Sequence, residues 1–310
     1  MITVLKAPPF ATVQDLGRTG HLHAAVPRAG ALDPLALIVA NLLVGNSRGT
    51  AAIEWGLAGG EVRFERDSII ALSGATARAT LGGRPLVGHR AERARAGECL
   101  SIERIETGAW LYLAVDGGIA VPPVLGSRAT YLPARFGGLE GRLLRTGDRL
   151  PLGPGAATVS PQNGAPPPLR AGETDEPIAL LPGPDREILA GPAWDWLLGT
   201  EFRVSRAVSR MGYRLEAPPL PLVLPGDRPS APACPGTVQL PPGGEPIVLM
   251  PDGPTVGGYL RIAVVATTDL GRLAQRTPGE RVRFRIIELS EARARLRRQE
   301  ELLNRLAQSA

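Results

Sequence analysis

The 310-residue sequence is poor in lysine and in aromatic residues. Lys6 is its only lysine, so it cannot contain a Walker A loop, whose lysine reaches the phosphates of a nucleotide. A Schiff base would have to form on the same residue, and no lysine is flanked by methionines as at a biotin attachment site. Aromatic residues make up 4% of the chain, which leaves few platforms for stacking nucleic-acid bases. These absences exclude a biotin carrier and argue against a nucleic-acid-binding protein.

Cysteine and histidine are also scarce. Cys99 and Cys234 show no CxxC spacing, so neither a cysteine zinc site nor a disulfide framework is indicated. His21 and His23 could place two imidazoles on one face of a strand, but no acidic cluster accompanies them. We expect the three histidines, His89 included, to be loop or surface residues, and we predict no metal site.

The remaining composition fits a soluble globular chain, with 44% hydrophobic and 21% charged residues. Its net charge of +5 comes from arginines scattered among acidic residues. The arginine fork favours planar anions such as carboxylates and phosphates. The N-terminus lacks the basic and apolar regions of a signal peptide, and no stretch approaches the roughly 18 apolar residues of a membrane span. We therefore expect a cytoplasmic protein.

Most apolar runs are short, rich in β-branched residues and bounded by some of the 38 glycines and 31 prolines. Such runs predict a mostly β chain, built as an antiparallel sandwich or barrel. The predicted strands are Ile2–Leu5, Val62–Phe64, Ile69–Leu72, Leu100–Ile102, Leu111–Val115, Ile178–Leu181, Phe202–Val204, Ile247–Met250, Ile262–Val265 and Val282–Leu289.

A glycine followed by an acidic residue recurs just before apolar runs. The pairs are Gly60-Glu61, Gly97-Glu98, Gly147-Asp148 and Gly279-Glu280. Because glycine adopts positive φ without strain, each pair predicts a hairpin corner. Their recurrence in both halves of the chain fits two similar β units.

Helical signals are few. Asp33 and Pro34 predict the start of a helix that ends near Gly45, with apolar residues spaced at three and four along it. A short helix is predicted over 269–275. A third is predicted over 290–307, begun by the capping residue Ser290 and carrying a stripe of leucines that we expect to dock on the β core or a partner.

Two proline-rich stretches divide the chain. Pro151–Pro177 predicts a linker, and Pro218–Pro246 predicts a long loop inside the second half. We therefore predict an N-terminal β domain over 1–165, a C-terminal β domain over 166–289 and a helical tail over 290–310.

Two segments of the first half combine glycines with polar groups. In the first, Asp15 and Arg18 precede Arg28, which lies just ahead of the helix capped by Asp33, whose free amides suit an anion. The alternative is a local Asp15–Arg18 ion pair and a simple cap. In the second, Ser127, Arg128 and Thr130 follow a pair of glycines and offer anion donors, although a plain hairpin explains them nearly as well.

Two further segments lie in the second half. Arg210 and Arg214 flank Tyr213 and could clamp a carboxylate; the alternative is surface charge beside a core methionine. The last segment holds Gln239, Asp252, Thr255 and Tyr259, with Gly257-Gly258 able to let the backbone approach a ligand. Asp252 follows an apolar strand, where a carboxylate is costly unless paired, so function is favoured there.

These segments, taken in order, resemble one protein family. The motifs are TVQDLGRTG, VPRAGALD, GSRAT, SRMGYRL, GTVQLPP, GGYLRIA and DLGRLAQRTPGERVRF. They resemble the KipA family, which is also known as the PxpC component of bacterial 5-oxoprolinase, allophanate hydrolase subunit 2 or the biotin-dependent carboxyltransferase family. The resemblance runs from about Val4 to Ile287. Ala25 stands where glycine is usual in the family, and Ala29 where serine is usual.

The resemblance implies two tandem cyclophilin-like β-barrels with a few short helices and a C-terminal helix. It also implies a KipI/PxpB-like partner, a possible PxpA-like lactam hydrolase subunit, and ATP, with Mg²⁺, shared with those partners. The expected activity is ATP-dependent hydrolysis of 5-oxoproline or a related lactam to glutamate. A carboxyltransferase using carboxybiotin on a separate carrier, and a non-catalytic module that binds a KipI-like protein, remain alternatives.

Within that expectation each candidate residue has a role. Asp15 and Asp252 are the expected catalytic carboxylates. The expected ligands of the phosphate or other anion are Arg18, Arg28, Ser127 and Arg128. The expected substrate-binding residues are Arg210, Tyr213, Arg214, Gln239, Thr255 and Tyr259.

Overall fold

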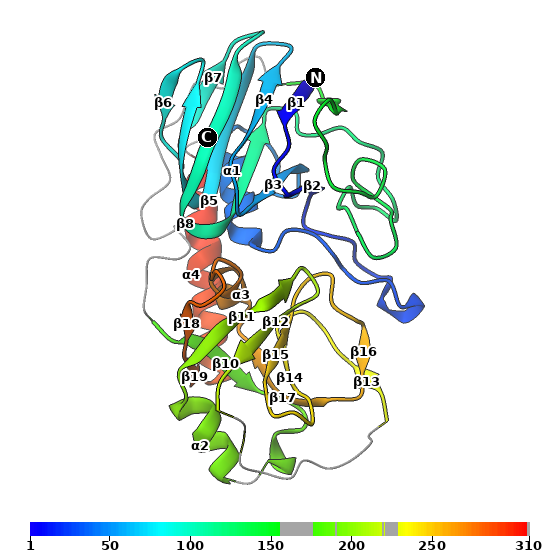
Figure 1. The fold of residues 1–310 in the computed structure, drawn as a ribbon, viewed down its shortest axis with the longest axis vertical. Helices are drawn as coiled ribbons and strands as arrows, with labels where there is room; N and C mark the ends of the chain where they lie inside the picture. Colours follow the sequence, from blue (N-terminus) through cyan, green and yellow to red (C-terminus); the bar gives the residue numbers. More distant parts are fainter. Residues whose placement is uncertain (156–175, 190, 219, 221–228, 309–310) are drawn as a thin grey trace. The chain divides into compact units, whose positions relative to one another are not determined.

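The computed structural model describes residues 1–155, 176–189, 191–218, 220 and 229–308. The predicted domain boundary at 165/166 lies outside these ranges, as does most of the predicted linker. The chain forms two compact units, coloured mainly blue to green and green to red in Figure 1. Unit 1 comprises residues 1–18, 29–173 and 300–310, and unit 2 comprises residues 19–28 and 174–299. Each unit is therefore built from separate stretches of the chain.

Unit 1 is built on a nine-stranded sheet. Its strands are β1 (Ile2–Lys6), β2 (Phe10–Gln14), β3 (Ala52–Gly56), β4 (Gly60–Phe64), β5 (Ser68–Leu81), β6 (Arg84–Leu86), β7 (Ala91–Ala94), β8 (Cys99–Val115) and β9 (Arg149–Leu150). They follow the order β2-β3-β8-β4-β1-β9, while β5 pairs with β6, β7 and β8. All of these pairs are antiparallel.

The segment around β9 joins the two sides of this sheet. Leu144 N donates to Ala11 O on β2 at 2.8 Å, and Val4 N on β1 donates to Asp148 O at 2.8 Å. Because β1 and β2 otherwise lie far apart in the strand order, these bonds bring the sheet round on itself. Val13, Ile53 and other apolar side chains fill the interior.

Helix α1 (Pro34–Leu43) covers part of the other face and packs against β5 and β8. It begins as predicted: the Asp33 side chain accepts a hydrogen bond from Ala36 N at 3.1 Å, and proline occupies the first turn. The strand positions beneath it include a buried polar row across three neighbouring strands, in which Glu54 pairs with Tyr112 and Tyr112 with Ser73.

Unit 2 is built on an eight-stranded sheet in the order β18-β11-β12-β15-β14-β17-β10-β19. Its strands are β10 (Ile178–Pro182), β11 (Phe202–Ser209), β12 (Gly212–Glu216), β14 (Thr237–Leu240), β15 (Ile247–Leu249), β17 (Leu260–Val265), β18 (Arg281–Val282) and β19 (Phe284–Ile286). Strands β13 (Ala231–Pro232) and β16 (Val256–Gly257) form a separate two-stranded ribbon.

One short segment closes the unit 2 sheet. Strands β18 and β19 are separated only by Arg283, yet β18 pairs with β11 at one end of the order and β19 pairs with β10 at the other. The β10–β19 pair is parallel, whereas the others in this sheet are antiparallel. The closed arrangement confirms the expected fold class: a mostly β chain with two barrel-like sheets.

The remaining helices belong mainly to unit 2. They are η1 (Leu22–Ala24), η3 (Arg186–Ile188), α2 (Gly191–Gly199), α3 (Thr267–Ala274) and α4 (Leu289–Gln308). Helices α3 and α4 confirm the predicted short and terminal helices, but α4 begins at Leu289, so Ser290 lies within it and is not its cap. The sequence patterns do not predict α2. The predicted leucine stripe consists of Leu296, Leu303 and Leu306; the last two are buried, whereas Leu296 is 39% exposed. No helix among the described residues has both the length and the apolar character needed to cross a membrane.

Three of the four predicted glycine corners form with one geometry. Gly97, Gly147 and Gly279 have φ values of 86°, 93° and 89°. In each turn the acidic side chain accepts a hydrogen bond from the backbone amide three residues earlier; Asp148 Oδ2, for example, accepts from Arg145 N at 2.7 Å. Gly60 differs because it is not at positive φ: it lies in β4, and a β-carbon there would come within 2.5 Å of the Trp55 ring.

Candidate functional site

The predicted site residues fall into two groups, one in each unit. Asp15, Arg18, Ser127 and Arg128 belong to unit 1. The others belong to unit 2; they are Arg28, Arg210, Tyr213, Arg214, Gln239, Asp252, Thr255 and Tyr259.

In unit 1 the Asp15 carboxylate is used to hold a loop. It accepts hydrogen bonds from Gly17 N at 2.8 Å, from Ser127 Oγ at 2.6 Å and from Arg128 N at 2.6 Å. Asp15 is 8% exposed and Ser127 is 2% exposed. These bonds fasten the 127–128 turn to the end of β2, so both side chains have a structural task here.

The two arginines of this group also bond to the protein's own carbonyls. Arg18 is buried, donates to Ala129 O at 2.5 Å and lies with its guanidinium 4.7 Å from the centre of the Phe136 ring. Arg128 Nε donates to Val121 O at 2.8 Å. A phosphate bound here would have to compete with these contacts for Arg18 Nη2 and Arg128 Nε.

Next to these residues, the start of α1 rests on a buried network that the sequence patterns did not reveal. Tyr112 donates to Glu54 Oε2 at 2.7 Å, while its oxygen accepts from Asp33 N at 2.8 Å; Leu32 N also donates to Glu54, at 2.9 Å. Burial, followed by the Glu54 charge, raises the pKa of Tyr112 well above its usual value. The isolated glutamate in the apolar run of β3 was the only sequence signal for this network.

In unit 2 the central feature is a buried ion pair between Arg210 and Asp252. Arg210 lies in the turn between β11 and β12, and its Nε and Nη2 atoms each donate to an Asp252 oxygen at 2.9 Å. Asp252 is 1% exposed, and its backbone amide also donates to Arg210 O at 2.9 Å. The guanidinium therefore fixes the loop that follows β15 and satisfies the predicted need of Asp252 for a partner.

The neighbouring residues on β12 face different surroundings. Arg214 is exposed and forms an ion pair with Glu245 at 3.3 Å. Tyr213 is buried, and its hydroxyl donates to Ala274 O at 2.8 Å. Arg210 and Arg214 thus engage different acidic residues instead of one shared carboxylate, because the first lies in the buried turn and the second on an outward strand position.

Gln239 stands out among the predicted residues of unit 2 by its hydrogen bonding. It lies on β14 and is 4% exposed, yet its Nε2 atom has no hydrogen-bond partner in the described part of the chain. Directly against this atom lies Gly257 of β16, where a β-carbon would be 2.7 Å from Nε2. Gly257 therefore permits a close approach of the backbone to Gln239, while the predicted approach to a ligand stays a prediction.

The remaining predicted residues of unit 2 are at least partly exposed. Thr255 is half-buried and its carbonyl accepts from Ala233 N at 2.9 Å, while Tyr259 is 46% exposed. Arg28 is exposed in the loop 19–28. In that loop Ala25 has a φ of 58°, a left-handed conformation that favours glycine.

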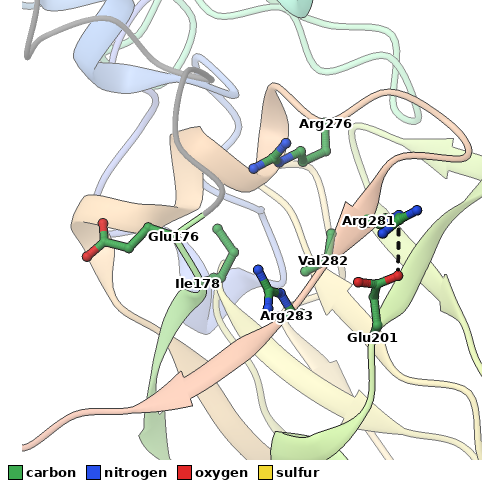
Figure 2. Close-up of a pocket in the computed structure, with 7 residues that line it drawn as sticks. All are labelled: Glu176, Ile178, Glu201, Arg276, Arg281, Val282 and Arg283. Atoms are coloured by element: carbon green, nitrogen blue, oxygen red, sulfur yellow. Dashed lines mark ion pairs between the residues drawn. The ribbon is translucent and has the colours of Figure 1, made fainter.

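Two hollows lie away from the predicted residues. In unit 1 an open groove of about 800 Å³ is lined by apolar residues and by Arg135, Arg142 and Arg145. In unit 2 a hollow of about 60 Å³ is lined by three arginines, shown with their neighbours in Figure 2. One of these, Arg281, forms an ion pair with Glu201 at 3.3 Å.

The described residues contain no group of three or more histidine, cysteine or acidic side chains placed to hold a metal ion. Chemically, unit 2 offers a buried carboxamide with an unused donor at Gln239, a carboxylate held by Arg210 at Asp252 and an exposed tyrosine at Tyr259. The unused amide donor is a group that can hydrogen-bond to a polar ligand.

The chain is similar to proteins of known name along nearly its whole length. Residues 24–286 match the family model described as "Carboxyltransferase domain, subdomain A and B". The chain is 39% identical to the C subunit of 5-oxoprolinase from Escherichia coli, covering 99% of this chain and 98% of that protein. It is 37% identical to the Haemophilus influenzae protein of the same name, covering 97% of this chain and 96% of that protein.

Solved structures agree with this relationship. The Kluyveromyces lactis urea amidolyase superposes with a TM-score of 0.91 at 28% identity, covering 98% of this chain and 20% of that one. The structure titled TTHA0988 gives a TM-score of 0.83 at 34% identity, covering 92% of this chain and 55% of that one. The chain therefore belongs to the carboxyltransferase-domain family that includes the C subunit of 5-oxoprolinase.

Proposed function

We propose that this chain is one subunit of an ATP-dependent hydrolase that opens 5-oxoproline, or a closely related lactam, to give glutamate. The observation that carries the proposal is the 37–39% identity, over almost the full length of both chains, to proteins named as the C subunit of 5-oxoprolinase. Such a match supports the same place in an assembly, because the chains correspond along nearly all of their length. The expected partners are a KipI/PxpB-like subunit and a PxpA-like lactam hydrolase subunit.

In this proposal the partner subunits bind ATP. The chain has one lysine, Lys6, and no Walker A loop. Arg18, Ser127 and Arg128, the phosphate ligands that the sequence suggested, hold the protein's own loop. The contribution of this chain is then to bind and orient the lactam.

The unit 2 loop is the region suited to that task. An unstrained lactam opens only if its carbonyl is activated and the developing negative charge on its oxygen is stabilised by donors. Gln239 supplies an unused donor, and Asp252 is held by Arg210 in a fixed place on the same loop that leads to Gly257. Arg210 therefore acts as a positioning residue, and the substrate carboxylate is left to exposed groups such as Tyr259.

The proposal is tested by coexpression of the chain with both candidate partners and measurement of ATP-dependent glutamate release from 5-oxoproline. We expect release from the three-subunit preparation and none when this chain is omitted. Full turnover by this chain alone would contradict the proposal, as would full turnover by the partners without it.

A carboxyltransferase is the second candidate, favoured by the matched family description and by the fit to urea amidolyase. It predicts that activity depends on a biotinylated carrier protein. Adding streptavidin, which occupies biotin, would stop a carboxyltransferase and leave a lactam hydrolase unaffected.

A further inference from the structure

The carboxamide of Gln239 is an anomaly in an otherwise well-bonded barrel. Buried amide groups in proteins are nearly always hydrogen bonded, because leaving one unsatisfied costs about 1–3 kcal/mol. Gln239 is 4% exposed, and its Nε2 atom has no partner among the described residues. A buried donor left unused in this way needs an explanation, and a partner outside the chain would supply one.

A primary carboxamide carries a donor and an acceptor side by side. A cyclic amide presents the complementary edge, because its ring forces the N–H and the C=O onto the same side. The two groups can therefore pair through two parallel hydrogen bonds, one in each direction. An open peptide in its usual trans form cannot do this, since its N–H and C=O point in opposite directions.

We propose that Gln239 recognises the cis-amide edge of a small cyclic ligand through this paired contact. The inference rests on the proposed function for the site but goes further, because it names the group that selects the ring. Gly257 is the second part of the device: a side chain there would come within 2.7 Å of Nε2 and cover the carboxamide.

Strand β16, which lies over the Gln239 carboxamide, is short, and the loop that leads to it is firmly held where it leaves β15. Gly257 lies on β16, which is two residues long and pairs with β13 in the separate ribbon. Moving this strand aside to admit a ligand breaks few hydrogen bonds. The same loop is fixed where it leaves β15, because Arg210 holds Asp252 with two bonds of 2.9 Å.

Two kinds of ligand carry the required edge. A five-membered lactam such as 5-oxoproline presents it once, and a cyclic urea such as the ureido ring of biotin presents it on either side of its carbonyl. The shared chemistry is a ring N–H beside a ring C=O, and the preference between the two rings distinguishes the hydrolase from the carboxyltransferase.

Binding to the full-length chain is measured by ligand-observed NMR with 5-oxoproline, 2-pyrrolidinone, 2-imidazolidinone and N-methyl-2-pyrrolidinone. The last compound keeps the carbonyl and lacks the N–H. We expect the wild-type chain to bind at least one of the first three more tightly than the N-methyl compound. Gln239→Met keeps the side-chain length and removes both polar atoms, so its binding should fall roughly 10- to 100-fold.

Gly257→Ala should weaken binding similarly, and Gly243→Ala is its matched control because a β-carbon there meets nothing within 4 Å. Thermal melting checks that each variant is folded; Gln239→Met loses no internal bond to Nε2 and should melt like the wild type. Equal binding by Gln239→Met and the wild type would overturn the inference. So would equal binding of the N-methyl compound, or no binding of any ring compound by the wild type.

Turnover of 5-oxoproline by the assembled complex is scored separately. Normal turnover with Gln239-independent binding removes this inference and leaves the proposed function standing. Binding that depends on Gln239, without turnover by the assembled complex, supports this inference and contradicts the proposed function.

Discussion

The same tripeptide, Thr-Val-Gln, lies on a strand in each unit, and the two glutamines have different fates. Gln14, at the end of β2, is fully buried; its Nε2 donates to Thr12 Oγ1 at 3.0 Å and to Thr130 O at 3.1 Å, while its Oε1 has no partner among the described residues. Gln239 on β14 is almost as buried, and its Nε2 has no partner among the described residues.

The difference extends to the acidic residues nearby. Asp15, next to Gln14, accepts three hydrogen bonds that fasten a loop of unit 1. Asp252 of unit 2 is also bonded, with both of its carboxylate oxygens accepting from Arg210. The loop that holds Asp252 continues to Gly257, which lies against the Nε2 atom of Gln239, and this atom has no partner among the described residues. Residue type and local sequence therefore do not predict whether the amide donor of a buried glutamine finds a partner within the fold.

The largest effect should come from removing the anchor of the unit 2 loop. Arg210→Ala leaves the Asp252 carboxylate buried without its ion pair, so the free energy of unfolding should fall by about 3–5 kcal/mol. Denaturant titration measures this. The double variant Arg210→Met with Asp252→Leu removes both charges and should recover much of the loss; no recovery would show that the pair is not what holds the loop.

Replacing each of the two glutamines by leucine tests whether they contribute differently to the free energy of unfolding. Gln14→Leu breaks two hydrogen bonds and leaves the Thr130 carbonyl without that donor, so it should destabilise the chain by about 1–3 kcal/mol. Gln239→Leu breaks no bond to Nε2 and should change the stability by less than about 1 kcal/mol. Similar losses at both positions would remove the distinction between the two segments.

A smaller, pH-dependent effect tests whether the Tyr112 hydroxyl in the unit 1 network is shielded from solvent. The pKa of Tyr112 is raised in the folded chain by burial and by the Glu54 charge. In the folded chain Tyr112 therefore keeps its proton above pH 10, where the same tyrosine loses its proton in the unfolded chain. The free energy of unfolding should accordingly fall as the pH rises above about 10. The slope from this group is at most about 1.4 kcal/mol per pH unit.

Tyr112→Phe should remove that slope, which is measured by denaturant titration at pH 9 to 11. Tyr259→Phe is the control because the Tyr259 side chain is exposed. An unchanged slope in Tyr112→Phe would contradict a protected hydroxyl.

The smallest effect is expected at the arginine that looked like the partner of Arg210 in a carboxylate clamp. Arg214 has a side chain 44% exposed and faces Glu245 at 3.3 Å. Arg214→Ala should change the stability by less than about 1 kcal/mol. A loss as large as that of Arg210→Ala would mean that the two arginines work as a pair after all.

Local signals made much of the fold predictable. The cap and spacing of α1 and the glycine corners at 97, 147 and 279 depend on residues within a few positions of one another. Strand β8 was predicted as two strands because charged residues and Gly108 interrupt its apolar pattern. It continues through them because β5 pairs along its length, with Arg78 of β5 opposite Arg104.

The candidate site was less predictable. The need of Asp252 for a partner could be read from its place after an apolar strand, but the choice of Arg210 could not, since 42 residues separate them. The bonding of Gln14 and the unsatisfied state of Gln239 depend on which distant backbone groups the fold brings near, and nothing adjacent in the sequence records that.

The closure of the unit 2 sheet has a consequence for how the chain acquires its shape. The segment Arg281–Ile286 pairs with both β11 and β10, whose residues are made about 80 and 100 positions earlier. Arg281–Ile286 must therefore leave the ribosome before the last seam of this barrel can form, and contacts of such long range are slow to make. Until then the edges of β10 and β11 stay open to other chains during synthesis, so the nascent polypeptide is prone to aggregate at that stage.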